Sequence, residues 1–99
     1  MKLHEIAHAR TGDKGDVSNI SVIAYRPEDW PRIVDALTPD RVAAHMGGVA
    51  AEDVTRYVLP QLHALNFVIR GALKGGVTRS LALDAHGKCL ASVLLDLEL

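Results

Sequence analysis

Two glycine-rich segments hold most of the side chains in this sequence whose types and spacing suit chemistry. The first runs from Arg10 to Asn19, between two β-rich stretches, and contains two glycines and four charged residues. Glycine permits positive φ and close backbone approach, so successive N–H groups here can form a concave anion-binding nest. The basic side chains would attract an anion, and the acidic ones would orient them or accept protons. The candidate residues are Arg10, Gly12, Asp13, Lys14, Gly15, Asp16 and Asn19.

The length of this first segment favours a role in binding. A hairpin usually turns within about two to five residues, and a longer connection is often functional. We therefore expect a ligand site or an interface in a long loop from Arg10 to Asn19. The alternative is a solvated loop whose charges pair with one another.

The second segment is Gly75-Gly76-Val77-Thr78-Arg79-Ser80. Its order and spacing differ from those of a phosphate-binding P-loop. Gly76, Thr78 and Arg79 would offer free donors, although the segment also suits a simple helix end and strand start. If the fold brings the two segments together, Arg10, Lys14 and Arg79 would surround a carboxylate, a phosphate or the acidic residues of a partner.

One polar residue, Asn66, interrupts the apolar stretch Leu65-Asn66-Phe67-Val68-Ile69 and needs hydrogen-bond partners if it is buried. We expect it either to cap a loop or to reach the candidate site. No nucleophile-elbow motif surrounds any serine. His4 and His8 would lie about 13 Å apart along a strand, too far to share a metal ion. The sequence therefore predicts no metal site and no cofactor.

Bulk properties exclude several classes of protein. The 99 residues suit one domain over 1–99. The formal net charge is −1, with 4% aromatic residues, so we expect neither a nucleic-acid-binding field nor a base-stacking surface. No apolar run approaches the roughly 20 residues of a membrane span. The lone Cys89 precludes an internal disulfide, and the start of the chain lacks the apolar run of a signal peptide, so we expect a cytoplasmic protein.

The periodicity predicts the elements that must position these residues. Alternation or β-rich composition predicts strands at Leu3–Ala9, Ile20–Tyr25 and Val54–Leu59. Start and stop signals predict a helical region over Asp29–Met46, with a bend at Thr38.

The rest of the chain is predicted as a helix followed by a hairpin. A helix is expected over Gln61–Leu73, with a strand at Leu65–Ile69 as the alternative. The final hairpin joins 78–84 to 88–97, and its odd-numbered apolar residues should face the core. This order favours an α+β sandwich, with two helical segments on one face of a mainly antiparallel sheet.

Several motifs together resemble the small C-terminal domain of the acyclic terpene utilisation (AtuA) family. The motifs are Ala7-His8-Ala9-Arg10-Thr11-Gly12-Asp13-Lys14-Gly15-Asp16, Leu37-Thr38 with Val42-Ala43-Ala44-His45, Arg56-Tyr57 with Leu59-Pro60, Ala64-Leu65-Asn66-Phe67, and Gly75-Gly76-Val77-Thr78-Arg79-Ser80-Leu81. The resemblance implies a ferredoxin-like fold and a link to catabolism of acyclic terpenes or acyl-CoA compounds. The usual family protein carries a large N-terminal domain, so the resemblance implies a free-standing small subunit and a separately encoded larger chain.

Three functions remain open at this point. The first is an accessory subunit that docks on a larger chain of the same family. The second is a small ligand-binding protein or enzyme acting on a carboxylate or CoA thioester, with the two glycine-rich segments around the anion. The third is a homo-oligomer, in which apolar sheet faces pair between copies, and it is compatible with either of the others.

Overall fold

The computed structural model describes residues 1–14, 17–47, 49–71 and 89–99, with the backbone alone for Asp13, Lys14 and Cys89. Four antiparallel strands form one sheet in the order β1-β2-β4-β3. The strands are β1 (Ala7–Lys14), β2 (Val17–Ala24), β3 (Val54–Leu59) and β4 (Ala64–Arg70). The α-helices are α1 (Trp30–Ala36), α2 (Pro39–Met46) and α4 (Cys89–Leu95). Single 3₁₀ turns are η1 (Leu3–Glu5), η2 (Pro27–Asp29), η3 (Ala51–Asp53) and η4 (Pro60–Leu62).

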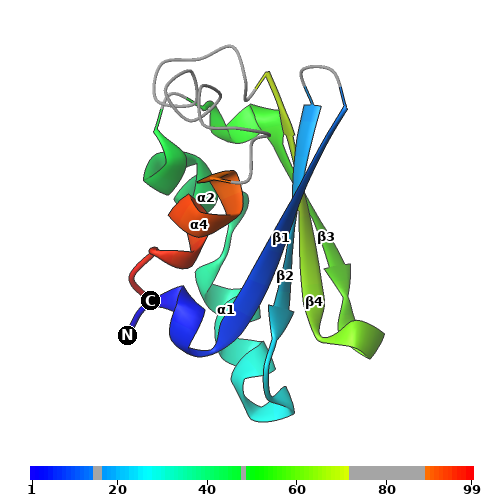
Figure 1. Cartoon of the computed structure of the whole chain (residues 1–99), viewed down its shortest axis with the longest axis vertical. Helices are drawn as coiled ribbons and strands as arrows, with labels where there is room; N and C mark the ends of the chain where they lie inside the picture. The colour runs from blue at the N-terminus through cyan, green and yellow to red at the C-terminus, as the bar shows by residue number, and fades with distance from the viewer. Residues whose placement is uncertain (15–16, 48, 72–88) are drawn as a thin grey trace.

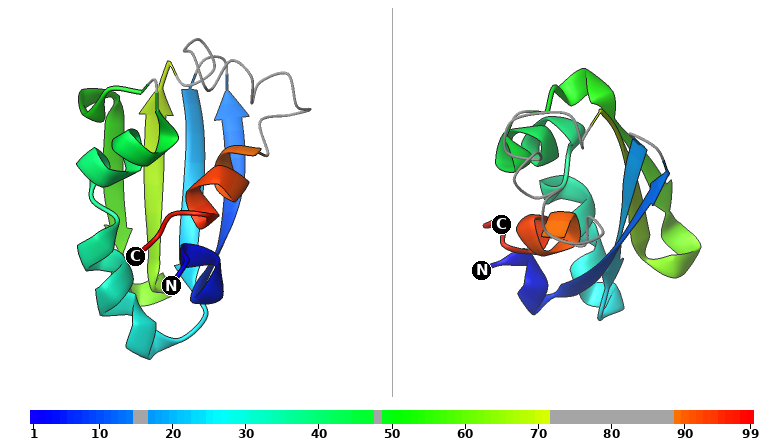
Figure 2. Two further views of the ribbon diagram at one scale, coloured as in Figure 1. Left: turned by 90° about the vertical axis from the view of Figure 1, so that its left-hand side faces the viewer. Right: turned by 45° about the horizontal axis from the view of Figure 1, so that its top comes forward.

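The three helices cover one face of the sheet, and no described helix lies on the other (Figures 1 and 2). Alternate strand residues point to opposite faces. Most of those that point toward the helices form an aliphatic core. On the two central strands, its fully buried apolar residues are Ile20, Val22, Leu65, Phe67 and Ile69, and Ser18 is buried beside them. This α+β arrangement of sheet and helices is ferredoxin-like and confirms the predicted fold class.

The predicted bend between two helical segments is confirmed at Thr38. This residue has extended backbone dihedrals, and its Oγ1 accepts a hydrogen bond from Arg41 N at 3.2 Å, as an N-cap does. Pro39 occupies the first position of α2, where a missing N–H has no cost. The cap and the proline act within a few residues, so the helix break predicted from the sequence is also the one found in the folded chain.

The predicted long loop from Arg10 to Asn19 is wrong. Both strands continue through it, and their register ends with Lys14 opposite Val17, so that two residues remain between the strands. Charge and glycine suggested a loop, but the exposed face of a sheet tolerates both. The start of β1 is also corrected, because Leu3–Glu5 forms a 3₁₀ turn instead of strand. In that turn the Glu5 carboxylate accepts a hydrogen bond from Lys2 N at 2.7 Å.

The predicted helix over Gln61–Leu73 is also wrong, and the alternative strand at Leu65–Ile69 is confirmed as the centre of β4. Burial follows a period of two from Leu65 to Ile69, with Asn66 and Val68 on the opposite face. Leu65, Val68 and Ile69, which matched a helical spacing, therefore belong to both faces of one central strand. His63, which precedes β4, has a φ of 48° and turns the chain back from η4 into the strand.

The predicted C-terminal hairpin is wrong at its second strand. Cys89–Leu95 is helix α4, and its buried residues Leu90, Ala91 and Leu94 follow a helical spacing. The odd-numbered set was expected to face the core, yet Leu90 and Leu94 are fully buried. The partner strand expected at 78–84 lies outside the described residues. In the described part of the chain, three helices rather than the two expected segments thus cover the sheet.

Candidate functional site

The face of the sheet that points away from the helices is the candidate site. Antiparallel partners in register point to the same side, so the pairing assigns each strand residue to one face. Arg10 is opposite Ser21, Ser21 is opposite Asn66, and Asn66 is opposite Tyr57. These four residues form one row across all four strands. Strands lie about 4.8 Å apart, so the row spans about 14 Å.

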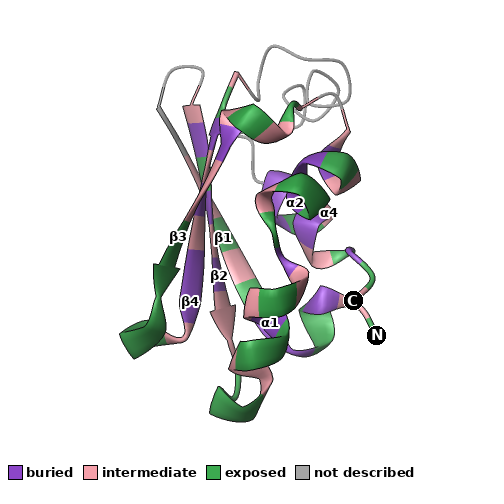
Figure 3. Cartoon of the chain, turned by 180° about the vertical axis from the view of Figure 1, so that it is seen from behind, coloured by how far each residue is buried: buried purple, intermediate pink, exposed green. Residues whose placement is uncertain are grey.

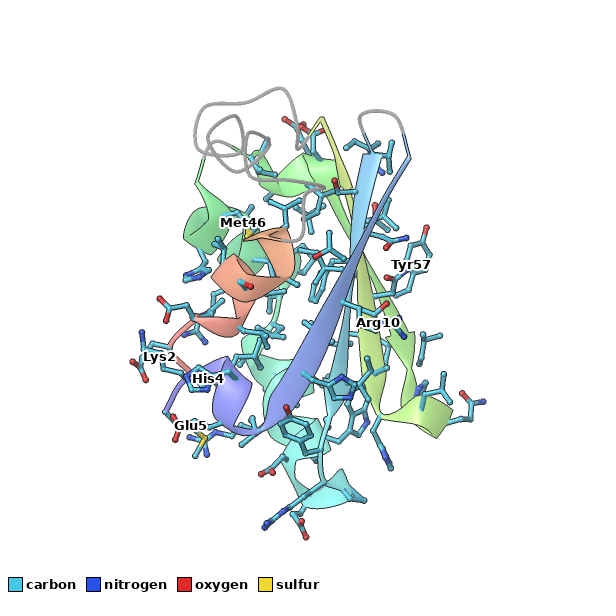
Figure 4. All side chains as sticks on the ribbon, in the orientation of Figure 1. Lys2, His4, Glu5, Arg10, Met46 and Tyr57 are labelled. Atoms are coloured by element: carbon cyan, nitrogen blue, oxygen red, sulfur yellow. The ribbon has the colours of Figure 1, made fainter. Side chains whose placement is uncertain are left out.

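The row presents mostly hydrogen-bond donors. Ser21 Oγ lies 3.3 Å from Asn66 Oδ1 and donates to it, so this bond does not use the amide NH₂ of Asn66. Arg10 and Tyr57, at the two ends, are exposed, and Tyr57 retains 52% of its accessible area. Figure 4 shows both side chains on the side of the sheet opposite the helices. A guanidinium, an amide and a phenol therefore lie in line for groups that accept hydrogen bonds.

Gly12 and Asn19 occupy the next row, where the missing Cβ of Gly12 leaves room for the Asn19 side chain. They are opposite in register, and the Asn19 side chain lies across the glycine. A Cβ on Gly12 would approach Asn19 Oδ1 to 2.8 Å, closer than real Cβ contacts. The glycine is therefore needed for space on this face rather than for a turn.

This face carries positive charge in a chain whose formal net charge is −1. The strand residues of described side chain that share it include His8, Arg10 and Arg70 but no carboxylate. Arg70 donates to Thr55 Oγ1 and to Glu52 O at 3.2 and 3.0 Å, which holds it at one border. His8, at the opposite border, stacks on Tyr25 with ring centroids 5.3 Å apart. The described strand side chains of this face therefore carry a net positive charge.

A smaller feature lies on the other side of β1, where α4 packs against the strand. Thr11 Oγ1 accepts a hydrogen bond from Ala91 N at 2.9 Å and joins the two elements. Beside this contact is a hollow of about 320 Å³ lined by Ala9, Arg10, Thr11, Ala91, Ser92 and Leu95. Its polar groups come from Arg10, Thr11 and Ser92, so it would fit a small, partly polar molecule.

The structure brings together four of the residues predicted from the sequence: Arg10, Gly12, Asn19 and Asn66 share the open face. Asp13 and Lys14 hold successive register positions on β1, with Asp13 opposite Ser18 and Lys14 opposite Val17. Because successive positions alternate between faces, these two residues do not share one side of the strand. The remaining predicted residues, Gly15, Asp16, Gly76, Thr78 and Arg79, lie outside the described residues. The meeting of Arg10 with Arg79 thus stays a prediction.

Sequence reasoning missed the roles of Ser21 and Tyr57 in this row. Both were visible as residues of predicted strands, and the alternation in Ile20–Tyr25 could have assigned Ser21 to one face. Only the pairing of β2 and β3 with β4 places them beside Asn66. Arg56, which precedes Tyr57, points the other way and donates to Val34 O and Leu37 O at the end of α1.

Among the described residues, no group of three or more histidine, cysteine or acidic side chains is placed to hold a metal ion. In the same parts of the chain, every helix is too short or too polar to cross a membrane.

The whole chain, residues 1–99, matches the family model of the AtuA ferredoxin-like domain. The chain belongs to this family. No curated protein and no solved structure gives a significant match. The AtuA ferredoxin-like assignment agrees with the sheet order and the one-sided helices, and the open face is the part of this domain that its own helices leave uncovered.

Proposed function

We propose that this chain is an accessory subunit whose open sheet face docks on an acidic surface of a larger chain. The observation that supports the proposal most directly is the row Arg10, Ser21, Asn66 and Tyr57, which crosses all four strands without a carboxylate. Donors without acidic neighbours favour a partner that supplies carboxylates and carbonyl oxygens. Self-docking of two such faces would bring like charges together.

The family membership suggests what the larger chain is. The domain that this chain resembles works beside a large N-terminal domain in the usual family protein, so we propose a large chain of the AtuA family as the partner. We place the pair in catabolism of acyclic terpenes or acyl-CoA compounds. In this assignment the small subunit completes the larger chain, and no reaction is assigned to the small subunit alone.

Affinity capture from the source cell, with mass spectrometry of the captured proteins, tests this proposal. The tagged wild-type chain should recover a larger AtuA-family chain, and recovery should fall as salt is raised because exposed charges are screened. Arg10→Glu should abolish recovery. Arg32→Glu on α1 is the matched control, because Arg32 is also exposed but lies on the helical side. A chain recovered alone, or equal recovery by the two variants, would contradict the proposal.

The hollow beside α4 favours a second candidate, a small carboxylate or acyl-CoA ligand near Arg10. Its volume of about 320 Å³ is at the lower end of the range for ligand pockets. Ligand at a hundred times its Kd should stabilise the fold by about 2.7 kcal/mol in a thermal-shift screen. Ser92→Trp should remove that shift by filling the hollow, without touching the open face. A flat screen at high ligand concentration would exclude this candidate.

A further inference from the structure

Edge strand β3 ends in a cluster of exposed apolar side chains. Tyr57, Val58, Leu59 and Leu62 retain 52%, 42%, 39% and 65% of their accessible area. The described residues contain only two other exposed large hydrophobic side chains, Met1 and Tyr25. Among the described residues, the exposed large apolar side chains are therefore concentrated on the last half of β3 and on η4. Figure 3 shows this end of β3 and the turn that follows it as exposed. Such concentration marks an interaction site.

The exposed apolar residues of β3 point to both sides of the sheet, so this cluster is not simply part of the open face. Tyr57 and Leu59 are opposite Asn66 and Ala64 and share the open face. Val58 is opposite the fully buried Leu65, so it points to the helical side, yet 42% of it is exposed. The described helices thus do not cover this end of β3, and no other described strand pairs with its outer edge.

The two edges of the sheet differ in their protection. On β1, the Thr11–Ala91 hydrogen bond holds α4 against the strand, and charged residues flank it. On β3, six consecutive residues pair regularly with β4 without a bulge. The only charged side chain from Val54 to Leu62 is Arg56, and its guanidinium is bonded to two carbonyl groups of α1. Natural edge strands usually carry lysines, prolines or bulges that prevent pairing, and β3 lacks them before Pro60.

We propose that β3 pairs antiparallel with β3 of a second copy of this chain and makes one continuous sheet across the two. A strand edge is self-complementary in this geometry, because a two-fold axis perpendicular to the sheet exchanges equivalent donors and acceptors. Directly opposite residues must share a face, so the axis passes through a residue position. An axis at Arg56 would oppose two like charges. The exposed apolar side chains on the last half of β3 favour an axis at Tyr57 or Val58, because it would bring them together across the two copies.

This self-association is independent of the proposed docking on a larger chain. Both open faces stay uncovered on the same side of the joined sheet, so either interaction can exist without the other. Val58 discriminates between them, because it lies on the helical side and contributes nothing to the open face. Val68 is its counterpart, since it lies on the open face of β4, away from the rim.

Sedimentation of the full chain over a wide concentration range tests the pairing. The wild type should reach twice the mass of one chain. Val58→Lys should weaken the dimer at least about tenfold, because its charge would face a lysine or Arg56 of the second copy. Val68→Lys is the matched control and should leave the dimer intact, because Val68 lies on the open face away from the rim. Circular dichroism melting confirms that both variants are folded.

Cysteine cross-linking gives a second measurement that does not depend on a destabilising charge. In a Cys89→Ser background, oxidation should link Tyr57→Cys or Val58→Cys to its own copy, because residues on the axis are within disulfide reach. Thr55→Cys should remain unlinked, since its counterpart lies away from the axis. A chain that stays monomeric at all concentrations, or a dimer that Val58→Lys leaves unchanged and neither cysteine captures, would overturn the proposal.

Discussion

Replacing Arg56 by methionine should destabilise the domain more than any other change to an arginine among its described residues. The Arg56 guanidinium donates from Nη1 to Val34 O at 2.7 Å and to Leu37 O at 3.0 Å. Both carbonyl groups lie at the C-terminal end of α1, where a helix leaves its last acceptors without internal partners. The arginine therefore caps α1 from the neighbouring strand, and its positive charge suits the negative end of the helix dipole.

The magnitude follows from the two bonds and their surroundings. A hydrogen bond to a charged group is worth about 1.5–3 kcal/mol, and an unsatisfied buried acceptor costs about 1–3 kcal/mol. Arg56 is half-buried, so water replaces part of what is lost. Methionine keeps much of the apolar packing of the side-chain stem. We expect Arg56→Met to cost about 2–3 kcal/mol, a large share of the roughly 5–15 kcal/mol typical of a domain.

Urea denaturation followed by circular dichroism measures this cost, and Arg70→Met is the matched control. Arg70 also makes two hydrogen bonds, to Thr55 Oγ1 and Glu52 O, but it is exposed. Water readily replaces the hydrogen bonds of an exposed side chain, so we expect Arg70→Met to lower the free energy of unfolding by less than about 1 kcal/mol. Equal losses for the two variants, or a loss below about 1 kcal/mol for Arg56→Met, would refute the capping argument.

Three further predictions concern α4, the open face and the chain ends. Leu94→Ala should cost about 2–5 kcal/mol because Leu94 is fully buried, whereas the half-buried Leu95→Ala should cost markedly less by the same urea titration; a strand would reverse the order. Gly12→Ala should change the free energy of unfolding by less than about 1 kcal/mol. It should shift the side-chain amide NMR signals of Asn19, because the new Cβ would lie 2.8 Å from Asn19 Oδ1 unless that side chain moves. The hydrogen bond and charge of Lys2 lower the pKa of the Asp96 carboxyl group. This pair therefore stabilises the fold at pH values above the usual carboxyl pKa, and the stabilisation is lost as the pH falls through the lowered pKa of Asp96. Wild type and Asp96→Asn should therefore differ slightly in stability at neutral pH and converge in acid.

Much of the fold was predictable wherever the signal was local. The broken helical region, the strand Val54–Leu59 and the α+β class follow from caps, prolines and β-rich runs, and the structure confirms all three. The errors share one cause. Charge and glycine in 10–19, and apolar periodicity in 61–73 and 88–97, were used to infer the backbone. In the described residues of these segments, pairing with distant strands or burial against them decided it.

Helix α4 illustrates that cause. Its apolar residues satisfy a period of two along the odd-numbered positions as well as a helical spacing, so periodicity alone permits both. The structure selects the helix because Leu90, Ala91 and Leu94, at helical spacing, all lie in the core. Thr11 Oγ1 of β1 accepts a hydrogen bond from Ala91 N in the first turn of this helix. The two residues are 80 positions apart, so the sequence around the helix does not indicate this contact.

The sequence by itself determined which residues have the chemistry for binding, because a guanidinium, an amide or a glycine keeps its properties in any fold. It also determined the helix break at Thr38, because a cap acts within four residues. Only the tertiary structure decided that these groups form one row. Ser21 and Asn66 are 45 residues apart, and they meet because β2 pairs with β4 in one register. That register is selected by burial of Ile20 and Phe67 against the helices, since a slip of one residue would turn each apolar side chain into water.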